Sequence, residues 1–206
     1  MLRLGVLVSG SGSNLQAILD AIAAGRLDAR VAVVLSNKPG VMALERATRA
    51  GVPTEVVSHR DYASREAFDE EVVRRLGAHG VELIVLAGFM RIVTQVVLGT
   101  FPGRVVNVHP SLLPAFPGVD AQAQAHAYGA KISGCTVHFV DGGLDSGPII
   151  AQSAVPVRDD DSVESLRDRI LAEEHALLPA VLQWIVEGRV RIDGRHVRVS
   201  DPATRA

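Results

Sequence analysis

The chain has 206 residues, of which 48% are hydrophobic and 21% charged, and this fits one globular domain with a full core. Its net charge of −2 gives no reason to expect a nucleic-acid partner or an anionic membrane surface. The apolar run in MLRLGVLVSG is too short for a signal peptide or a membrane span. The single cysteine, Cys135, cannot form an internal disulfide and suits a reducing compartment, as a core residue rather than a nucleophile. We therefore expect a cytoplasmic protein.

Short β-branched runs alternate with helical patterns through the first half of the chain. The expected strands are 4–8, 31–35, 55–57, 83–86 and 105–108, and the expected helices are 14–24, 41–50, 64–77 and 94–99. Strands that are apolar almost throughout are typical of a parallel sheet buried on both faces. The alternation therefore predicts the α/β class, with a mostly parallel twisted sheet flanked by helices.

The pattern changes after a proline-rich turn. Longer strand-like stretches at 133–140 and 148–157 predict antiparallel strands at one edge of the sheet, and a helix is expected over 162–187, beginning at Ser162 and stopping at Gly188. The segment 190–199 has an Asp-Gly turn between alternating runs, which predicts a β-hairpin. The last six residues, 201–206, are expected to be frayed.

The first expected strand runs directly into SGSGSNLQ, residues 9–16, and then into a helix. The backbone N–H groups of such a loop and the positive end of the helix favour a bound phosphate. Leu15 stands where a dinucleotide fingerprint needs a third glycine, and the GK[ST] ending of a P-loop is missing, so one phosphate or a mononucleotide fits best. A purely structural turn, with Ser13 or Asn14 as the helix cap, is the alternative.

The motif NVHPSLLP, residues 107–114, places an amide and an imidazole where an apolar strand ends. Asn107 and His109 are two residues apart and should lie on the same side of that strand. The glycine-rich stretch 141–148 can bring Asp145 close to His109, where its carboxylate would favour the imidazolium. These three residues would then handle protons without a covalent nucleophile, whereas a plain turn role for Asp145 is the alternative.

The stretch LAGFMRIV, residues 86–93, ends another strand at the carboxyl edge of the sheet, where ligands of open α/β sheets collect. Met90, Ile92 and Val93 are placed to wall an apolar slot. Arg91 is available for a carboxylate or for structural pairing. The alternative is that Met90 fills the core.

Other chemistries find less support in the sequence. The nucleophile-elbow pattern of hydrolases is absent, and Ser111 is expected to form a turn. Glu174, beside His175, is either half of a solvated pair or a ligand contact. The histidines outside the motif show no metal-binding spacing, so no metal is expected; they are His59, His79, His126, His138, His175 and His196.

Several motifs together resemble the phosphoribosylglycinamide formyltransferase family, the folate-dependent formyl transferases of purine synthesis. They are SGSGSNLQAI, SNK, LAGFMRI, NVHPSLLP and DGGLDSGPII, in the family's order, and the likeness runs from the first strand to about Glu187. The resemblance implies a Rossmann-like formyltransferase fold. It also implies formyl transfer from 10-formyltetrahydrofolate to the amine of N1-(5-phospho-D-ribosyl)glycinamide, by direct attack through a tetrahedral intermediate.

The resemblance also implies roles for individual residues. The substrate phosphate is held by Gly12, Ser13 and Asn14, and Glu174 contacts the ribose or the amine. The folate contacts are Met90, Arg91, Ile92, Val93 and Asn107, with Arg65 near the glutamate tail and Asp141, Gly142, Gly143 and Leu144 around the pterin. Asn107, His109 and Asp145 match the catalytic positions. Asp120 is a departure, because many relatives carry histidine there.

On this basis the chain is expected to be a single formyltransferase domain over 1–206. It would comprise a phosphate-binding half at 1–100, a catalytic and folate-binding half at 101–190, and a C-terminal hairpin and tail at 191–206. Its expected partners are the two small-molecule substrates, in a monomer or homodimer, without nucleic acid, membrane or metal.

Three alternatives remain open. In a formyltetrahydrofolate hydrolase, water would replace the amine and the phosphate loop would have no use. Formylation of methionyl-tRNA would call for a substantial carboxyl-terminal domain and a basic surface, which the chain lacks. A non-catalytic sugar-phosphate binding protein would leave the Asn/His/Asp set idle.

Overall fold

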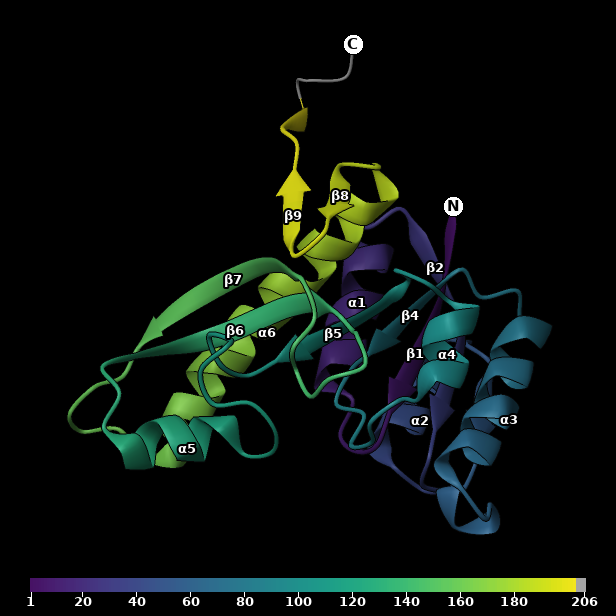
Figure 1. Cartoon of the computed structure of the whole chain (residues 1–206), viewed down its shortest axis with the longest axis horizontal. Coiled ribbons are helices and arrows are strands. Elements are labelled where there is room, and N and C mark those ends of the chain that lie inside the picture. Colours follow the sequence, from purple (N-terminus) through teal and green to yellow (C-terminus); the bar gives the residue numbers. More distant parts are fainter. Residues whose placement is uncertain (203–206) are drawn as a thin grey trace. The chain divides into compact units, whose positions relative to one another are not determined.

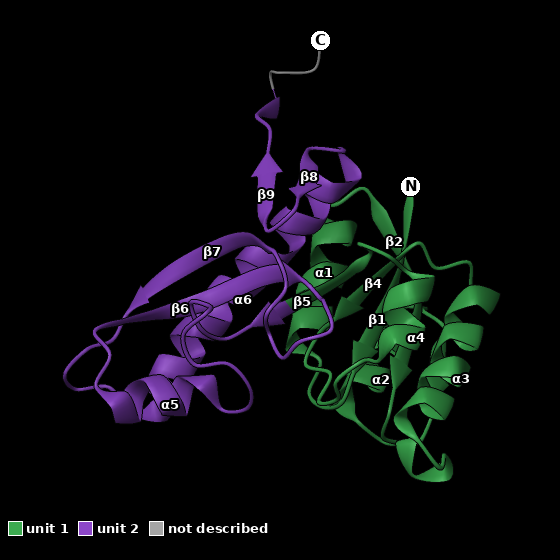
Figure 2. Ribbon diagram, viewed as in Figure 1, with its two compact units in different colours: residues 1–107 green, residues 108–206 purple. Residues whose placement is uncertain are grey.

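A computed structural model describes residues 1–202 and divides the chain into two compact units, residues 1–107 and 108–206 (Figure 2). The expected single domain, with its three-part division, stays a prediction. Of the tail expected to be frayed, residues 203–206 lie outside the described part of the chain.

The first unit is a parallel sheet with helices packed around it (Figure 1). Its strands are β1 (Leu2–Val8), β2 (Ala29–Ser36), β3 (Thr54–Val56), β4 (Leu83–Leu86) and β5 (Val105–His109), the last of which continues into the second unit. Its helices are α1 (Ser13–Ala23), α2 (Met42–Arg49), η1 (His59–Asp61), α3 (Arg65–Ala78) and α4 (Gln95–Thr100). The strand order is β3-β2-β1-β4-β5, and every neighbouring pair is parallel.

The strand order places a topological switch point between β1 and β4. Chain connections leave β1 toward β2 on one side and reach β4 and β5 on the other. The loops that follow the carboxyl ends of β1 and β4 therefore diverge, and ligands of open α/β sheets bind in the crevice that this leaves. The core of the unit supports these ends rigidly, because β1 is buried from Leu4 to Val8.

The second unit combines an antiparallel strand pair with a long helix. Its elements are α5 (Ala121–Tyr128), β6 (Ile132–Phe139), β7 (Ile149–Pro156), α6 (Val163–Val186), β8 (Val190–Asp193) and β9 (His196–Val199). The pairs β6–β7 and β8–β9 are antiparallel. Helix α6 packs along β6 and β7, as Figure 1 shows, around a core of Cys135, Val155, Leu166 and Ile170.

The termini of α6 show why the sequence predicted them. Ser162 accepts a hydrogen bond from the N–H of Ser165, whose hydroxyl accepts one from the Ser162 N–H in return, so a capping box fixes the start. Gly188, at a φ of 67°, follows the last turn in the left-handed region that a glycine adopts easily.

The expected fold class is confirmed: a mostly parallel sheet is flanked by helices and accompanied by antiparallel strands. Two elements were missed. Helix α5 lies where no helix or strand was expected, because its Ala-Gln sequence favours a helix without showing an apolar stripe, and it buries just Ala121 and Ala125. The short turn η1 buries no side chain.

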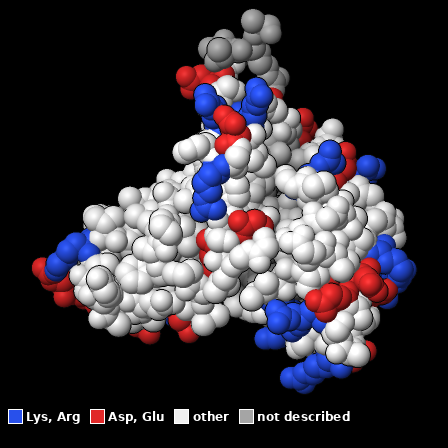
Figure 3. Space-filling view, in the orientation of Figure 1, with Lys and Arg blue, Asp and Glu red and all other residues white. Residues whose placement is uncertain are grey.

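Two expectations about the chain's surroundings can be compared with its structure. No helix among residues 1–202 combines the length and apolarity needed to cross a membrane. On the face drawn in Figure 3, basic and acidic side chains lie near one another, mostly toward the margins, and much of the face carries neither. That face therefore resembles a mixed-charge surface more than the basic surface that nucleic acid requires.

Candidate active site

The loop after β1 forms a small pocket. A cavity of about 170 Å³ is lined by Ser9, Gly10, Ser11, Gly12, Ser13, Asn14, Ala87, Gly88 and Met90. Gly12 is the N-cap of α1 at a φ of 72°, and no side chain caps the helix, so Ser13 and Asn14 do not act as the cap. An uncapped amino end presents backbone N–H groups and a positive dipole, which suits an anion.

Helix α2 holds this loop in place. A Cβ added at Gly12 would lie 2.6 Å from the Cβ of Ala43, so the loop and the helix approach as closely as a glycine permits. Ala43 donates its N–H to the carbonyl of Gly10 at 3.1 Å, and Arg46 Nε donates to the carbonyl of Ser11 at 2.9 Å. The Arg46 guanidinium thus adds a positive charge beside the loop, which favours an anionic ligand.

The segment after β4 exposes apolar side chains. Met90 is 66% and Ile92 49% exposed, whereas Val93 is buried. The alternative that Met90 fills the core is therefore wrong. Exposed apolar side chains beside a pocket leave a surface that an apolar ligand can cover.

Helix α3 holds the segment after β4 through two side chains, Phe68 and Asp69. The Arg91 guanidinium lies 5.2 Å from the centre of the Phe68 ring, so of its two expected uses the structure shows a structural pairing. The Thr94 N–H donates to Asp69 Oδ2 at 2.6 Å, and burial raises the pKa of Asp69. Arg65, at the first position of α3, is exposed.

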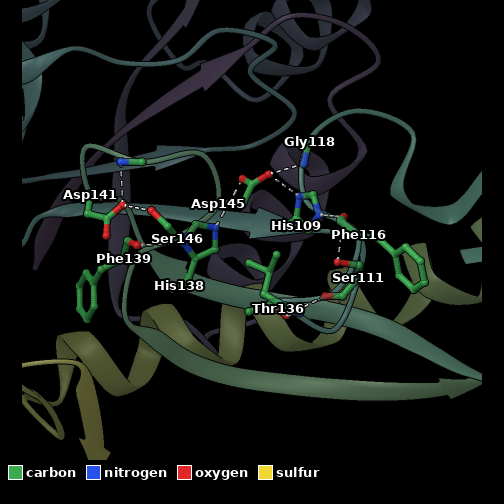
Figure 4. Close-up of polar contacts among 12 residues, drawn as sticks. His109, Ser111, Phe116, Gly118, Thr136, His138, Phe139, Asp141, Asp145 and Ser146 are labelled. Atoms are coloured by element: carbon green, nitrogen blue, oxygen red, sulfur yellow. Dashed lines mark hydrogen bonds and ion pairs between the residues drawn. The ribbon is translucent and has the colours of Figure 1, made fainter. Parts of the chain in front are cut away.

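In the second unit, Asp145 lies between two histidines (Figure 4). Its Oδ2 atom is 3.4 Å from Nδ1 of His109 and accepts the N–H of Gly118 at 2.8 Å. Its Oδ1 atom is 3.9 Å from Nε2 of His138. His109 is 4% and His138 1% exposed, so these contacts are shielded from solvent. Asp145 thus approaches His109 as the sequence predicts.

The hydrogen bonds of the two rings indicate their proton positions. His109 Nε2 lies 2.9 Å from the carbonyl of Phe116, and that oxygen can only accept, so Nε2 carries a proton. Since Nδ1 of the same ring faces a carboxylate, a doubly protonated His109 satisfies both contacts. In His138, Nδ1 faces the carbonyl of Phe139 at 2.8 Å, and burial lowers the pKa of this ring. Burial thus disfavours a charged His138, and of the two imidazoles His109 lies nearer to the Asp145 carboxylate.

The loop that carries Asp145 is held by its own hydrogen bonds. Asp141 Oδ1 accepts the Ser146 hydroxyl at 2.6 Å and the Gly143 N–H at 3.0 Å. Burial alone would raise the pKa of Asp141, but these two bonds, together with the nearby charge of Arg195, lower it. A Cβ at Gly147 would lie 1.8 Å from the carbonyl oxygen of Phe139, so this position accepts glycine alone. Asp145 itself has a φ of 47°, a left-handed conformation that the loop must enforce.

The remaining predicted residues occupy three elements. Asn107 is on β5, two residues before His109, so both side chains leave the strand on the same face. Glu174, on α6, is 5% exposed, so the solvated-pair alternative is wrong, and its substrate contact stays a prediction. Asp120 is the exposed N-cap of α5, with a φ of 53°.

Several contributors were missed by sequence reasoning. His138 was grouped with the histidines of no assigned role, although it stands in an apolar run just before the glycine-rich loop, a position that could have marked it. The carbonyl of Phe116 and the N–H of Gly118 are backbone atoms, so residue types carry no signal for them. Ser111 was correctly expected to form a turn, because its hydroxyl donates to the carbonyl of Ala115 at 2.5 Å.

Comparison with known proteins decides the family. The formyl transferase family model matches residues 2–182. Phosphoribosylglycinamide formyltransferase of Escherichia coli (strain K12) is 42% identical over 187 residues, which cover 91% of this chain and 88% of that protein. The chain belongs to the phosphoribosylglycinamide formyltransferase family.

Solved structures of phosphoribosylglycinamide formyltransferases agree with this assignment. Glycinamide ribonucleotide transformylase 1 from Symbiobacterium toebii is 55% identical, with a TM-score of 0.96 over 98% of this chain and 95% of that one. The trifunctional purine biosynthetic protein adenosine-3 of Drosophila melanogaster is 52% identical over 92% of this chain. The chain spans 14% of the length of that larger protein.

Among residues 1–202, no three histidine, cysteine or acidic side chains gather in a way that could hold a metal ion. Cys135 was correctly expected to fill the core: it is fully buried, and burial raises the pKa of its thiol to about 12.

Proposed function

We propose that this chain transfers the formyl group of 10-formyltetrahydrofolate to the amine of N1-(5-phospho-D-ribosyl)glycinamide, a step of de novo purine synthesis. The observation that carries the proposal is the 3.4 Å approach of Asp145 Oδ2 to His109 Nδ1, on motifs shared with the family. A buried imidazole paired with a carboxylate is the arrangement expected of an acid–base catalyst.

The substrate sites are assigned on the same basis. The ribonucleotide phosphate binds at Gly12, Ser13 and Asn14, because that loop combines a glycine N-cap with an uncapped helix end. Glu174 contacts the ribose or the amine. The folate contacts the exposed side chains of the segment 90–93, together with Arg65, Asn107 and the loop 141–144.

The mechanism requires no covalent enzyme intermediate. The substrate amine attacks the formyl carbon, a new C–N bond forms, and the carbonyl oxygen becomes negative in a tetrahedral species. Asn107 and doubly protonated His109 stabilise that oxygen by donating hydrogen bonds, so the mechanism uses no metal. The bond to folate N10 then breaks, while the proton lost by the amine passes to N10 with the help of His109.

The contacts of His109 define what the substrate must displace. Its Nε2 proton is donated to the Phe116 carbonyl, so a reacting oxygen has to compete with that carbonyl or accept a second, shared bond. Asp145 stays on the opposite nitrogen throughout. The carboxylate can therefore keep the ring charged while Nε2 serves the reaction.

The other expectations become proposals of the same kind. We propose a cytoplasmic enzyme, because its free cysteine is a buried core residue, which suits a reducing compartment. We also propose that it acts on small molecules as a monomer or homodimer. The phosphate loop disfavours a formyltetrahydrofolate hydrolase. A sugar-phosphate binding protein would have no use for the shielded pair of Asp145 and His109.

One assay tests the proposal. Purified protein is mixed with glycinamide ribonucleotide and 10-formyltetrahydrofolate, and formyl transfer is followed against a control without ribonucleotide. We expect ribonucleotide-dependent turnover that falls about a hundredfold or more in His109→Ala, the scale of lost acid–base assistance. Formate release at the same rate with and without the ribonucleotide would identify a hydrolase instead. Tight ribonucleotide binding with no turnover would refute the proposed formyl-transfer activity and indicate a binding protein.

A further inference from the structure

A buried hydroxyl bridges two loops of the first unit. Ser9 directly follows β1 and opens the phosphate loop. Its hydroxyl donates to Asn37 Oδ1 at 2.7 Å and accepts the N–H of Met90 at 2.9 Å, and its own N–H donates to the carbonyl of Gly88 at 3.1 Å. One residue thus holds the chain on both sides of Phe89, where β4 passes into the segment assigned to the folate.

The direction of each bond in this bridge is fixed. A serine hydroxyl has one proton, and because that proton goes to Asn37, the oxygen lone pairs are left for the Met90 N–H. Asn37 is held in turn, with its Nδ2 atom 3.3 Å from Nδ1 of His59. Ser9 and Asn37 are 5% and 3% exposed, so solvent screens these bonds weakly.

The bridge lies at the switch point of the sheet. Strands β1 and β4 are neighbours, but the loops after them diverge. The bonds of Ser9 to Gly88 and Met90 join these two loops. The pocket lined by Gly12 and Asn14 also includes Ser9, Gly88 and Met90. A ligand in this pocket therefore rests on both loops at once.

We propose that Ser9 is a positioning residue that couples the two substrate sites. An anion that orders the loop 10–14 also fixes Ser9, and through its hydroxyl the position of Met90, so the ribonucleotide strengthens folate binding. By linkage, the folate strengthens ribonucleotide binding by the same factor. This inference rests on the proposed function, because it uses the substrate sites assigned there.

The test measures the coupling between the sites rather than activity. The dissociation constant of glycinamide ribonucleotide is measured by calorimetry, alone and with saturating tetrahydrofolate, which has no formyl group to transfer. We expect tetrahydrofolate to tighten ribonucleotide binding about fivefold or more in the native chain, the lower end of typical couplings. In Ser9→Ala the factor should fall below about twofold.

Ser36→Ala is the matched control. Its hydroxyl is also fully buried at a strand end of the same sheet, but it donates to the carbonyl of Lys38 at 2.7 Å, within its own turn. This variant should keep the native coupling factor. If Ser9→Ala does not fold, Asn37→Ala replaces it, since that variant removes the acceptor that orients the hydroxyl, and its coupling should also fall.

The outcomes separate two kinds of failure. Native protein that binds both ligands without coupling, or with a coupling that Ser9→Ala leaves intact, overturns this inference alone. Full coupling in Asn37→Ala does the same where Ser9→Ala cannot be made. Native protein that binds neither ligand overturns the proposed function, and this inference with it.

Discussion

Asp145→Asn removes one charge at the proposed centre and leaves the shape of the side chain unchanged. The amide oxygen can still accept the Gly118 N–H, which Asp145 now accepts at 2.8 Å, so the loop has no reason to move. The variant therefore isolates the attraction between the carboxylate and the His109 imidazolium.

The distance sets the size of the effect. Two unit charges 3.4 Å apart attract by about 5 kcal/mol at an effective dielectric constant of about 20, which suits side chains that are 5% and 13% exposed. The remaining amide dipole recovers part of this, so we expect a loss of about 3–4 kcal/mol in the transition state. That corresponds to a fall in kcat of about a hundredfold to a thousandfold.

The assay is kcat for formyl transfer at saturating concentrations of both substrates, with thermal unfolding as the check on folding. Asp168→Asn, which removes an exposed carboxylate from the same unit, should keep native kcat. A folded Asp145→Asn protein whose kcat stays within tenfold of the native value would refute the reasoning, because the charge would then not act on the reaction.

Three further predictions follow from packing and titration. Gly12→Ala places a methyl group against Ala43 and forces φ 72° on alanine, so ribonucleotide affinity should fall at least about tenfold by calorimetry; native affinity would contradict the close approach. Burial raises the pKa of Asp69, so the folded state binds the proton more tightly than the unfolded chain. The contribution of Asp69 to stability should then increase as pH falls toward about 4, so in urea titrations the stability of the native chain relative to Asp69→Asn should increase over the same range; a constant difference would argue against the shift. Because burial raises the pKa of the Cys135 thiol to about 12, an aromatic disulfide reagent should label it after unfolding and leave the native protein unlabelled, and rapid native labelling would show the site to be open.

Local patterns were enough to predict most of the fold. Each strand of the first unit is a short β-branched run bounded by turn residues. The start of α6 is indicated by Ser162 and Ser165, which form its capping box. Helix α5 escaped because alanine and glutamine have helical propensity without an apolar stripe, so its existence depends on the packing of Ala121 and Ala125.

The candidate site could be predicted in part for a related reason. Asn107, His109 and Asp145 are uncommon residue types in informative places, and the sequence marks them. The contacts of His138 and of the Phe116 carbonyl form when segments distant in the sequence come together. The contact between Ser9 and Met90 likewise joins residues 81 positions apart. No periodicity in a single sequence records such pairings.

The contacts at both nitrogens of the His109 imidazole also have a spectroscopic consequence. In the doubly protonated state that we propose, one ring proton faces the Phe116 carbonyl and the other the Asp145 carboxylate, and burial of the ring slows their exchange with bulk water. Such protons should give resolved downfield resonances in nitrogen-15 correlated spectra. The proton count of this ring can then be read directly in the intact protein, one nitrogen at a time, as substrates are added.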